Sequence, residues 1–330
     1  MIAFQQKKVL VTGASGFLGS HLAEALLREG AHVRALVRGS GAHGAGSSLE
    51  RVAGGRDVEV APGDLRDLAA VRRAARDVDQ VFHVGGLGCV PSSLEDPLTY
   101  VDVNVRGSAH VLQAAREAGV GGVLLMSSSE VYGGARYNPV DEAHPVQPRS
   151  PYAASKLATE QLGASYHTSF GLPVTIVRGF NVYGPRQPER NLVPTLVRQA
   201  LEGDEVRTGR LDSVRDYIYV TDAIDALLLL ATTPAAVGRT FNVGSGLGST
   251  ADDLIAFIAK IMKKELRVHS DPALIRPRGI QARCLIADPD AVCRVTGWRP
   301  KVALDQGLGE VVRWYQERRE RGGAREFGPA

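Results

Sequence analysis

The stretch VLVTGASGFLGSHLAEAL, residues 9–26, decides the fold, because it joins an apolar run to a helical pattern through three regularly spaced glycines. Between a strand and a helix, glycines spaced G-x-x-G-x-x-G allow a tight turn, a close backbone approach to a pyrophosphate and close helix packing. The start of the helix adds free N–H groups and partial positive charge for phosphates. The stretch therefore predicts a dinucleotide site, with a purely structural glycine turn as the alternative. The residues expected to bind the dinucleotide here are Gly13, Ser15, Gly16, Phe17, Leu18 and Gly19.

Short apolar segments alternate with helical patterns through the first 180 residues. Between most of the segments lie helical patterns such as FLGSHLAEALLREG, which we expect to stop at Gly30. This alternation predicts an α/β fold of the Rossmann type, a doubly wound parallel sheet with helices on both faces. The expected strands are KVLVTGAS, HVRALVR, DVEVAPGD, QVFHVGG, GVLLMSSS and PVTIVRG.

The alternation of short apolar segments and helical patterns changes near residue 180. Short, proline-marked segments then separate helices that we expect around 191–202, 221–233, 249–264 and 304–319. We therefore predict two parts. Residues 1–180 form the dinucleotide-binding Rossmann domain, and residues 181–330 form mainly a smaller C-terminal substrate-binding lobe, interleaved with the last strands of the sheet.

The composition argues against several classes of function. The hydrophobic share of 44% and the charged share of 23% are ordinary for a soluble globular protein. A net charge of +3 is too small to indicate nucleic acid or a membrane surface, and no apolar run is long enough to span a bilayer. The three cysteines are odd in number and lack metal-ligand spacing, which fits a reducing cytoplasm. We expect no metal site.

The end of the second expected strand bears on the choice of cofactor. An NAD site of this type usually has Asp or Glu there, to hold the ribose hydroxyls. This chain has Val37 and Arg38 instead. An arginine can pair with a 2′-phosphate, which favours NADP, while a solvated Arg38 would leave NAD as the cofactor. Asp64, followed by Leu65 at the end of the third strand, would suit the adenine amino group, or would cap the next helix.

The stretch SPYAASK, residues 150–156, places Tyr152 and Lys156 four residues apart, on one face of a helix. A phenol is a poor base at neutral pH, but a neighbouring ammonium and a nicotinamide cation would both lower its pKa. Y-x-x-x-K alone is a weak signal. Combined with the glycine motif and the hydroxyl-rich strand end at 127–129, it predicts removal of a proton from an alcohol as hydride leaves.

Five stretches, TGASGFLG, SSSEVYG, SPYAASK, RGFNVYGPRQ and RDYIYV, together resemble the extended short-chain dehydrogenase/reductase family, in its nucleotide-sugar epimerase/dehydratase branch. The resemblance covers residues from about 8 to about 315. It implies a Rossmann domain with a sugar-nucleotide lobe, a bound nicotinamide dinucleotide, a nucleoside diphosphate sugar as substrate and a homodimer. By position, Ser128 and Tyr152 would grip the C4 oxygen of the sugar, with Tyr152 as the base. Lys156 would bind the nicotinamide ribose and lower the pKa of the tyrosine.

Glu130 distinguishes reactions within this branch. A 4,6-dehydratase oxidises C4, after which a carboxylate removes the acidified C5 proton while the C6 hydroxyl leaves. Ser128-Ser129-Glu130 resembles the form found in GDP-mannose 4,6-dehydratases, as does PRSPYAA, residues 148–154. Enzymes acting on dTDP-glucose usually have Asp at the position of Ser129. The wider phrasing is similar to dehydratases acting on UDP-N-acetylhexosamines. The resemblance thus favours an NDP-sugar 4,6-dehydratase.

Several alternatives stay open. UDP-glucuronate decarboxylases share Ser-Glu-Val-Tyr-Gly, and 4-epimerases need only the oxidation at C4. An NADPH-dependent 4-ketosugar reductase and a silent dinucleotide-binding regulator are further readings, although the complete set of Ser128, Tyr152 and Lys156 argues against the regulator. Glu130 itself could instead cap a turn or pair with an arginine.

The C-terminal half supplies further candidates through the resemblance. Asn181 is similar to an asparagine that bonds the diphosphate, and Arg215 to an arginine that clamps it, while Arg278 would add a second clamp. Structural roles are the alternative for all three. The loop HVGGLGCVPSS, residues 83–93, departs from the His-Leu-Ala-Ala of most relatives. We read its Cys89 as an inert thiol, with a substrate-facing residue as the alternative. Asn104 is expected to tie backbone near the site.

Overall fold

The computed structural model describes residues 4–39, 58–275 and 282–320. Its centre is a seven-stranded sheet in the order β3-β2-β1-β4-β5-β6-β10, and every neighbouring pair is parallel. The first six strands coincide with the six segments expected from the sequence, so the Rossmann-type fold is confirmed. The strands are β1 (Lys8–Thr12), β2 (His32–Val37), β3 (Glu59–Pro62), β4 (Gln80–His83), β5 (Gly122–Ser128), β6 (Val174–Gly179) and β10 (Thr240–Val243).

Both faces of this sheet are buried, which is why its strands read as continuous apolar runs. Successive side chains of a strand point to opposite faces. Accordingly, Val9 and Val11 of β1 join one core cluster, and Leu10 joins the other. In β4, Val81 and Phe82 divide between the clusters in the same way.

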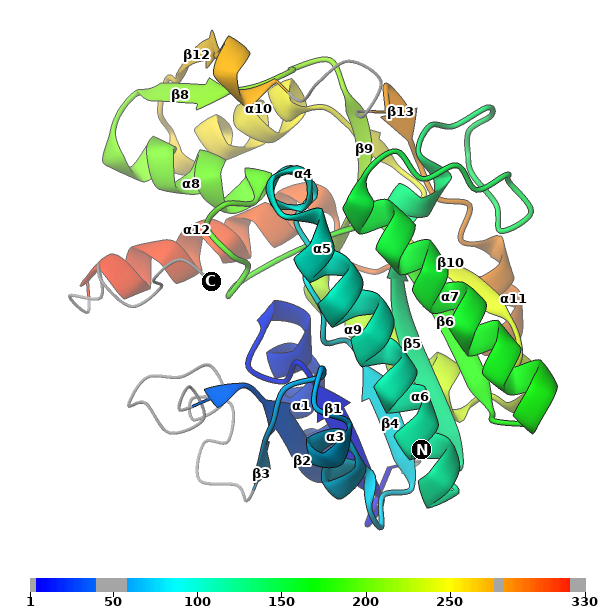
Figure 1. Ribbon diagram of the computed structural model, residues 1–330. Coiled ribbons are helices and arrows are strands. Elements are labelled where there is room, and N and C mark those ends of the chain that lie inside the picture. The colour runs from blue at the N-terminus through cyan, green and yellow to red at the C-terminus, as the bar shows by residue number, and fades with distance from the viewer. Residues whose placement is uncertain (1–3, 40–57, 276–281, 321–330) are drawn as a thin grey trace.

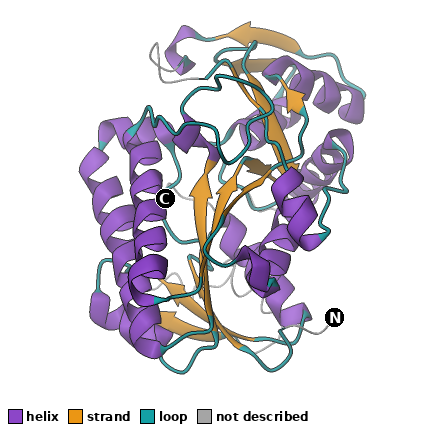
Figure 2. Cartoon of the chain, turned by 90° about the vertical axis from the view of Figure 1, so that its right-hand side faces the viewer, coloured by secondary structure: helices purple, strands orange, loops and turns teal. Residues whose placement is uncertain are grey.

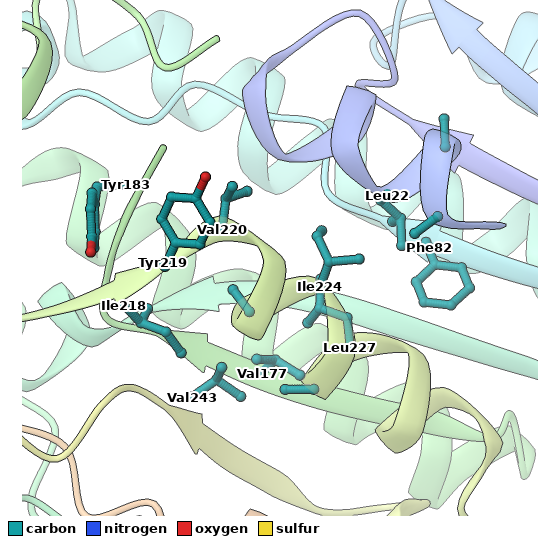
Figure 3. Packing of buried hydrophobic residues seen from close by; sticks show 14 of the residues in the cluster. Leu22, Phe82, Val177, Tyr183, Ile218, Tyr219, Val220, Ile224, Leu227 and Val243 are labelled. Carbon is teal, nitrogen blue, oxygen red and sulfur yellow. The ribbon is translucent and has the colours of Figure 1, made fainter. Parts of the chain in front are cut away.

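Helices cover the two faces, as the side view in Figure 2 shows. One cluster includes residues of α1 (Phe17–Arg28), α9 (Val220–Thr232) and α11 (Asp290–Thr296). Figure 3 shows Ile224 and Leu227 of α9 in this cluster with Leu22 of α1 and Val177 of β6. The other cluster includes residues of α3 (Leu68–Ala75) and α6 (Gly107–Ala118), with side chains of α7 (Pro151–Phe170) packed against it.

The C-terminal half builds two small sheets and further helices beside the carboxyl ends of the main strands (Figure 1). Strand β9 (Val214–Tyr219) pairs with β7 (Asn181–Tyr183), β11 (Gly248–Ser249) and β13 (Cys284–Leu285). Strand β8 (Glu205–Thr208) pairs with β12 (Arg267–Ser270). The larger helices are α8 (Leu192–Glu202), α10 (Ala251–Met262) and α12 (Leu304–Glu320). These and α9 match the predicted helices to within about two residues, the usual uncertainty of helix ends. The division at residue 180 stays a prediction.

Several shorter helices connect the longer strands and helices. After β4 the chain forms α4 (Val90–Glu95), α5 (Pro97–Tyr100) and the π-helix η2 (Val101–Arg106), which runs into α6. After β5 comes the 3₁₀ helix η3 (Ser129–Tyr132), and η4 (Pro234–Ala236) and η5 (Pro272–Leu274) lie farther along. None of the helices in the described ranges combines the length and apolarity needed to cross a bilayer.

Candidate active site

A cavity of about 650 Å³ lies where β1, β2, β4, β5 and β6 end, and loops of the C-terminal half also line it. This is where an open parallel sheet binds ligands. All but one of the residues predicted from the sequence line the cavity, and the exception, Arg278, lies outside the described residues. Those brought together are Gly13, Ser15, Gly16, Phe17, Leu18, Gly19, Arg38, Asp64, Leu65, Ser128, Ser129, Glu130, Tyr152, Lys156, Asn181 and Arg215.

The glycine turn has the shape that a pyrophosphate needs. Gly13 has φ +69°, a left-handed conformation that favours glycine. A Cβ on Gly19 would overlap the carbonyl oxygen of Gly13, so helix and turn can pack this closely only without one. Gly16 caps α1 with no side-chain hydrogen bond, and the first turn has no acidic residue. The N–H groups and positive end of α1 are therefore suited to phosphates, as a dinucleotide requires.

The residues expected near the adenosine lie at the ends of β2 and β3. Arg38 is exposed and follows β2 directly. Asp64 accepts hydrogen bonds from the Arg66 side chain at 2.9 and 2.8 Å, and this arginine is the main cause of a pKa lowered to about 2. Asp64 therefore remains a carboxylate. It does not cap the next helix, because Asp67 does so by accepting from the N–H groups at 69 and 70.

Ser128, Tyr152 and Lys156 meet where β5 ends and α7 begins. Ser150 caps α7, and this cap sets Tyr152 in the first turn of the helix, with Lys156 one turn later. A hydrogen bond joins the Tyr152 phenol to the Ser128 side chain, and this bond lowers the pKa of the phenol. Lys156 is 9% exposed, and burial lowers its pKa to about 8. The ammonium is mostly protonated at pH 7.

The pKa of Tyr152 differs from the sequence-based expectation. Burial raises it to about 12, the Ser128 hydrogen bond opposes the rise, and the charge of Glu130 adds to it. The protein's own groups therefore keep the phenol neutral near pH 7. A nearby positive charge, such as that of oxidised nicotinamide, would act in the opposite direction.

Glu130 lies in the first turn of η3, and its backbone N–H donates to Ser128 Oγ at 3.2 Å. The carboxylate lines the cavity, and its charge acts on Tyr152. A hydroxyl, a carboxylate and a phenol thus face one space. Such a set can exchange a proton with an alcohol and remove a second proton from an adjacent carbon.

The wall formed by the glycine-rich loop after β4 is held by Asn104, as the sequence predicted. The Asn104 amide accepts from the Leu87 N–H at 2.8 Å and donates to the Leu87 carbonyl at 3.1 Å. It also donates to Ser155 Oγ on α7 at 2.9 Å. Asn104 belongs to the π-helix η2, a helix type that is frequent at functional sites. Gly86 has φ +156°, and a Cβ there would press on the Asn104 side chain.

Tyr100 was missed by the sequence analysis. Its ring packs edge-on against Tyr152, with centroids 6.2 Å apart, and its hydroxyl donates to the Cys89 carbonyl at 2.7 Å. The Cys89 thiol lines the cavity and accepts from Ser92 Oγ at 3.2 Å. The inert role of Cys89 stays a prediction. No local motif marks Tyr100, because its contact with Tyr152 spans many residues of chain.

The C-terminal half contributes polar groups to the far part of the cavity. Asn181 donates to the Asp216 carbonyl at 3.0 Å, and Arg215 is 9% exposed. Arg190 and Arg210 also line the cavity and were not predicted, since neither falls at a matched position of the quoted motifs. Within the described ranges, no three His, Cys, Asp or Glu side chains gather closely enough to hold a metal ion.

Comparison with known proteins gives the family. The family model described as GDP-mannose 4,6 dehydratase matches residues 10–311. The chain belongs to this family. It is 31% identical over 315 residues to a dTDP-glucose 4,6-dehydratase of Streptomyces griseus, covering 94% of each chain. It is 33% identical over 317 residues to a UDP-glucose 4-epimerase of Mycolicibacterium smegmatis, covering 94% of this chain and 99% of the relative.

A solved structure agrees with these relatives. The dTDP-glucose 4,6-dehydratase DesIV of Streptomyces venezuelae, with NAD and TYD bound, superposes with a TM-score of 0.84 at 30% identity. The alignment covers 95% of this chain and 98% of that one. The resemblance to nucleotide-sugar epimerases and dehydratases is therefore confirmed, and this member of the GDP-mannose 4,6 dehydratase family is an enzyme of the NAD(P)-dependent epimerase/dehydratase class.

Proposed function

We propose that the enzyme is an NAD(P)-dependent 4,6-dehydratase of a nucleoside diphosphate hexose. The observation that carries the proposal is the position of Glu130. Its carboxylate lines the same cavity as Ser128 and Tyr152, close enough for its charge to act on the phenol. Oxidation at C4 and epimerisation there do not need this carboxylate, whereas removal of a C5 proton does.

The chain's own residues would divide the reaction as follows. Ser128 and Tyr152 hold the C4 hydroxyl, and Tyr152 takes its proton as the C4 ketone forms. Glu130 then takes the C5 proton, made acidic by the adjacent ketone, while the C6–O bond breaks and the C6 hydroxyl leaves. The two protons held by Tyr152 and Glu130 balance the reaction, because one completes the departing water and the other returns to C5 to give a 4-keto-6-deoxy sugar. Bound oxidised NAD(P) supplies a hydride acceptor for C4, and its reduced form supplies the hydride for C6.

The cofactor would lie along the glycine turn, with its diphosphate at the start of α1 and its nicotinamide ribose near Lys156. The open N-terminus of α1 and the clash that a Cβ at Gly19 would cause support this placement. Arg38 at the end of β2 supports NADP, while the solved relative was determined with NAD. Parallel titrations with NAD and NADP separate the two, and tighter binding of NAD would overturn the preference for NADP.

Epimerisation at C4 is the second candidate, since one of the relatives at 33% identity is named a UDP-glucose 4-epimerase. UDP-glucuronate decarboxylation, 4-ketosugar reduction and silent dinucleotide binding rank below it. Asn181, Arg215 and Arg278 are retained as candidate contacts to the substrate diphosphate, and Ser129 as a contact to the sugar. The homodimer and the cytoplasmic location implied by the resemblance also remain proposals. Size-exclusion chromatography with light scattering tests the dimer.

The deciding experiment offers the purified enzyme a panel of GDP-, UDP-, dTDP- and CDP-sugars and follows product mass. Loss of water supports the proposal. Loss of carbon dioxide would instead indicate decarboxylation, and an isomer of unchanged mass would indicate epimerisation. Tyr152→Phe serves as the control, because every one of these reactions begins with oxidation at C4 and should stop in this variant.

A further inference from the structure

A buried ion pair lies directly behind the candidate active site. Arg178 of β6 and Glu160 of α7 are 7% and 2% exposed. Arg178 Nη2 donates to Glu160 Oε2 at 2.8 Å, and Arg178 Nε donates to Oε1 at 3.0 Å. Ser127 Oγ donates to the same Oε1. Buried ion pairs seldom exceed apolar packing in stability, but the loss of one partner leaves an uncompensated buried charge.

The pair ties together the two elements that carry the catalytic candidates. Ser127 precedes Ser128 at the end of β5, and Glu160 follows Lys156 by one turn on α7. Arg178 Nη1 also donates to the Tyr132 hydroxyl of η3 at 2.9 Å. That hydroxyl in turn donates to Asn242 Oδ1 of β10 at 2.8 Å.

We propose that Glu160 is a positioning residue that acts through Lys156, and that its pairing with Arg178 sets the charge of the Lys156 ammonium. The inference rests on the proposed function only for what Lys156 does with the nicotinamide ribose. How Lys156 titrates is a property of the protein itself. The i, i+4 spacing places Glu160 on the same helix face as Lys156, one turn away.

Among the groups that act on Lys156, Glu160 is the negative charge that stabilises the protonated ammonium. Burial lowers the pKa of His83 to about 3 with help from Lys156, so this imidazole is neutral. Its two ring nitrogens bond Thr12 and Ser108, each at 2.8 Å. Burial lowers the pKa of Lys156, and the charge of Glu160 opposes this. The elements packed against α7 also carry Tyr100 of α5, Glu130 and Tyr132 of η3, and Arg178 of β6, and α7 itself carries Tyr152.

Removal of the negative charge and removal of the positive charge should therefore shift the pKa of Lys156 in opposite directions. Glu160→Gln removes the negative charge and leaves Arg178 positive, so the pKa of Lys156 should fall by about one unit or more. Arg178→Gln leaves Glu160 negative without its counter-charge and should raise the pKa of Lys156. Ser127→Ala removes a hydrogen bond to Glu160 and no charge, and should leave the titration close to that of the wild type. If the ion pair only held β6 and α7 together, the two substitutions would not shift the pKa of Lys156 in opposite directions.

The titration can be read without substrate or cofactor. The chain has seven lysines, so NMR of the enzyme labelled with ¹³C at the lysine side chains is tractable. The Lys156 signal is the one that disappears in Lys156→Gln. Opposite shifts in Glu160→Gln and Arg178→Gln would support the proposal. Shifts of one sign, no shift, or a wild-type Lys156 that titrates like a solvent-exposed lysine would overturn it.

A second variant keeps the test decisive if a lone buried charge prevents folding. Glu160→Gln/Arg178→Gln removes both charges and leaves two amides that can bond each other. Because Glu160 is the member on the helix face of Lys156, the pKa of Lys156 should still fall in this variant, by less than in Glu160→Gln. An unchanged pKa would overturn the proposal. Failure of the nucleotide-sugar panel would leave these titrations unaffected, so the two proposals fail separately.

Discussion

Substitution of Glu130 by glutamine should separate oxidation at C4 from elimination across C5 and C6. Glutamine keeps the size of the side chain and removes its charge and its basicity. In the structure the charge of Glu130 raises the pKa of Tyr152. Glu130→Gln should therefore lower that pKa and leave oxidation at C4 as fast as before or faster.

The expected magnitudes follow from these two effects. A positioned general base contributes about 10²–10⁴-fold, so water loss should slow by that factor. This corresponds to about 2.7–5.5 kcal/mol in the barrier of the elimination step. In contrast, each unit by which the pKa of Tyr152 falls would raise its phenolate fraction about tenfold at neutral pH.

Three signals follow the steps separately. The near-ultraviolet absorbance of reduced nicotinamide reports oxidation at C4, deuterium uptake from D₂O at C5 reports proton removal, and product mass reports water loss. In Glu130→Gln, the reduced cofactor should accumulate while deuterium uptake and water loss become slow. Glu95→Gln, an exposed carboxamide substitution at the end of α4, is the matched control and should behave as the wild type. Water loss at the wild-type rate in Glu130→Gln would refute the assigned role.

Three further substitutions test other parts of the site. Gly19→Ala should lower dinucleotide affinity about tenfold or more and destabilise the fold by about 1–3 kcal/mol, because its Cβ would overlap the Gly13 carbonyl. Calorimetry measures the affinity and thermal unfolding measures the stability. The control is Gly309→Ala on α12, where a Cβ meets nothing within 4 Å, and this substitution should stabilise the protein by up to about 1 kcal/mol. Arg38→Ala should weaken NADP binding by about 1.5–3 kcal/mol and spare NAD, and equal losses for both would contradict a 2′-phosphate contact. Asn104→Ala should destabilise by about 1–3 kcal/mol and speed hydrogen exchange in the loop after β4, and unchanged exchange would mean that another contact holds the loop.

The sheet and the dinucleotide turn could be predicted because their signals are local. A parallel strand buried on both faces needs a continuous apolar run, and β5 shows one directly before Ser127. Gly19 is required by its close contact with the Gly13 carbonyl, within seven residues of chain, and Gly13 adopts the left-handed φ of +69° that its local turn needs. Tyr152 and Lys156 were found for the same reason, since four residues on one helix fix their relation.

The remaining features depend on contacts between distant segments. Glu160 and Arg178 are 18 residues apart and on different elements, and neither alone differs from an exposed charge in the sequence. The direction of the Tyr152 pKa shift could not be predicted either, because burial decides it and burial belongs to the folded chain. The sequence predicted that Asn104 ties backbone near the site, but it did not identify Leu87 as the partner.

The segment from Ser128 to Glu130 places opposite demands on Tyr152. The hydroxyl stabilises the phenolate, and the carboxylate two residues later destabilises it. With burial added, the protein alone keeps the phenol protonated, so Tyr152 can act as a base only when another positive charge stands beside it. Oxidised nicotinamide carries such a charge and reduced nicotinamide does not. Tyr152 should therefore accept a proton while the cofactor is oxidised. Once C4 has lost its hydride and the positive charge is gone, the pKa of Tyr152 should rise, and the phenol should keep that proton. The charge of Glu130 raises the phenol's pKa in both states, so in the proposed mechanism Tyr152 retains the C4 proton while Glu130 is the group assigned to the proton at C5.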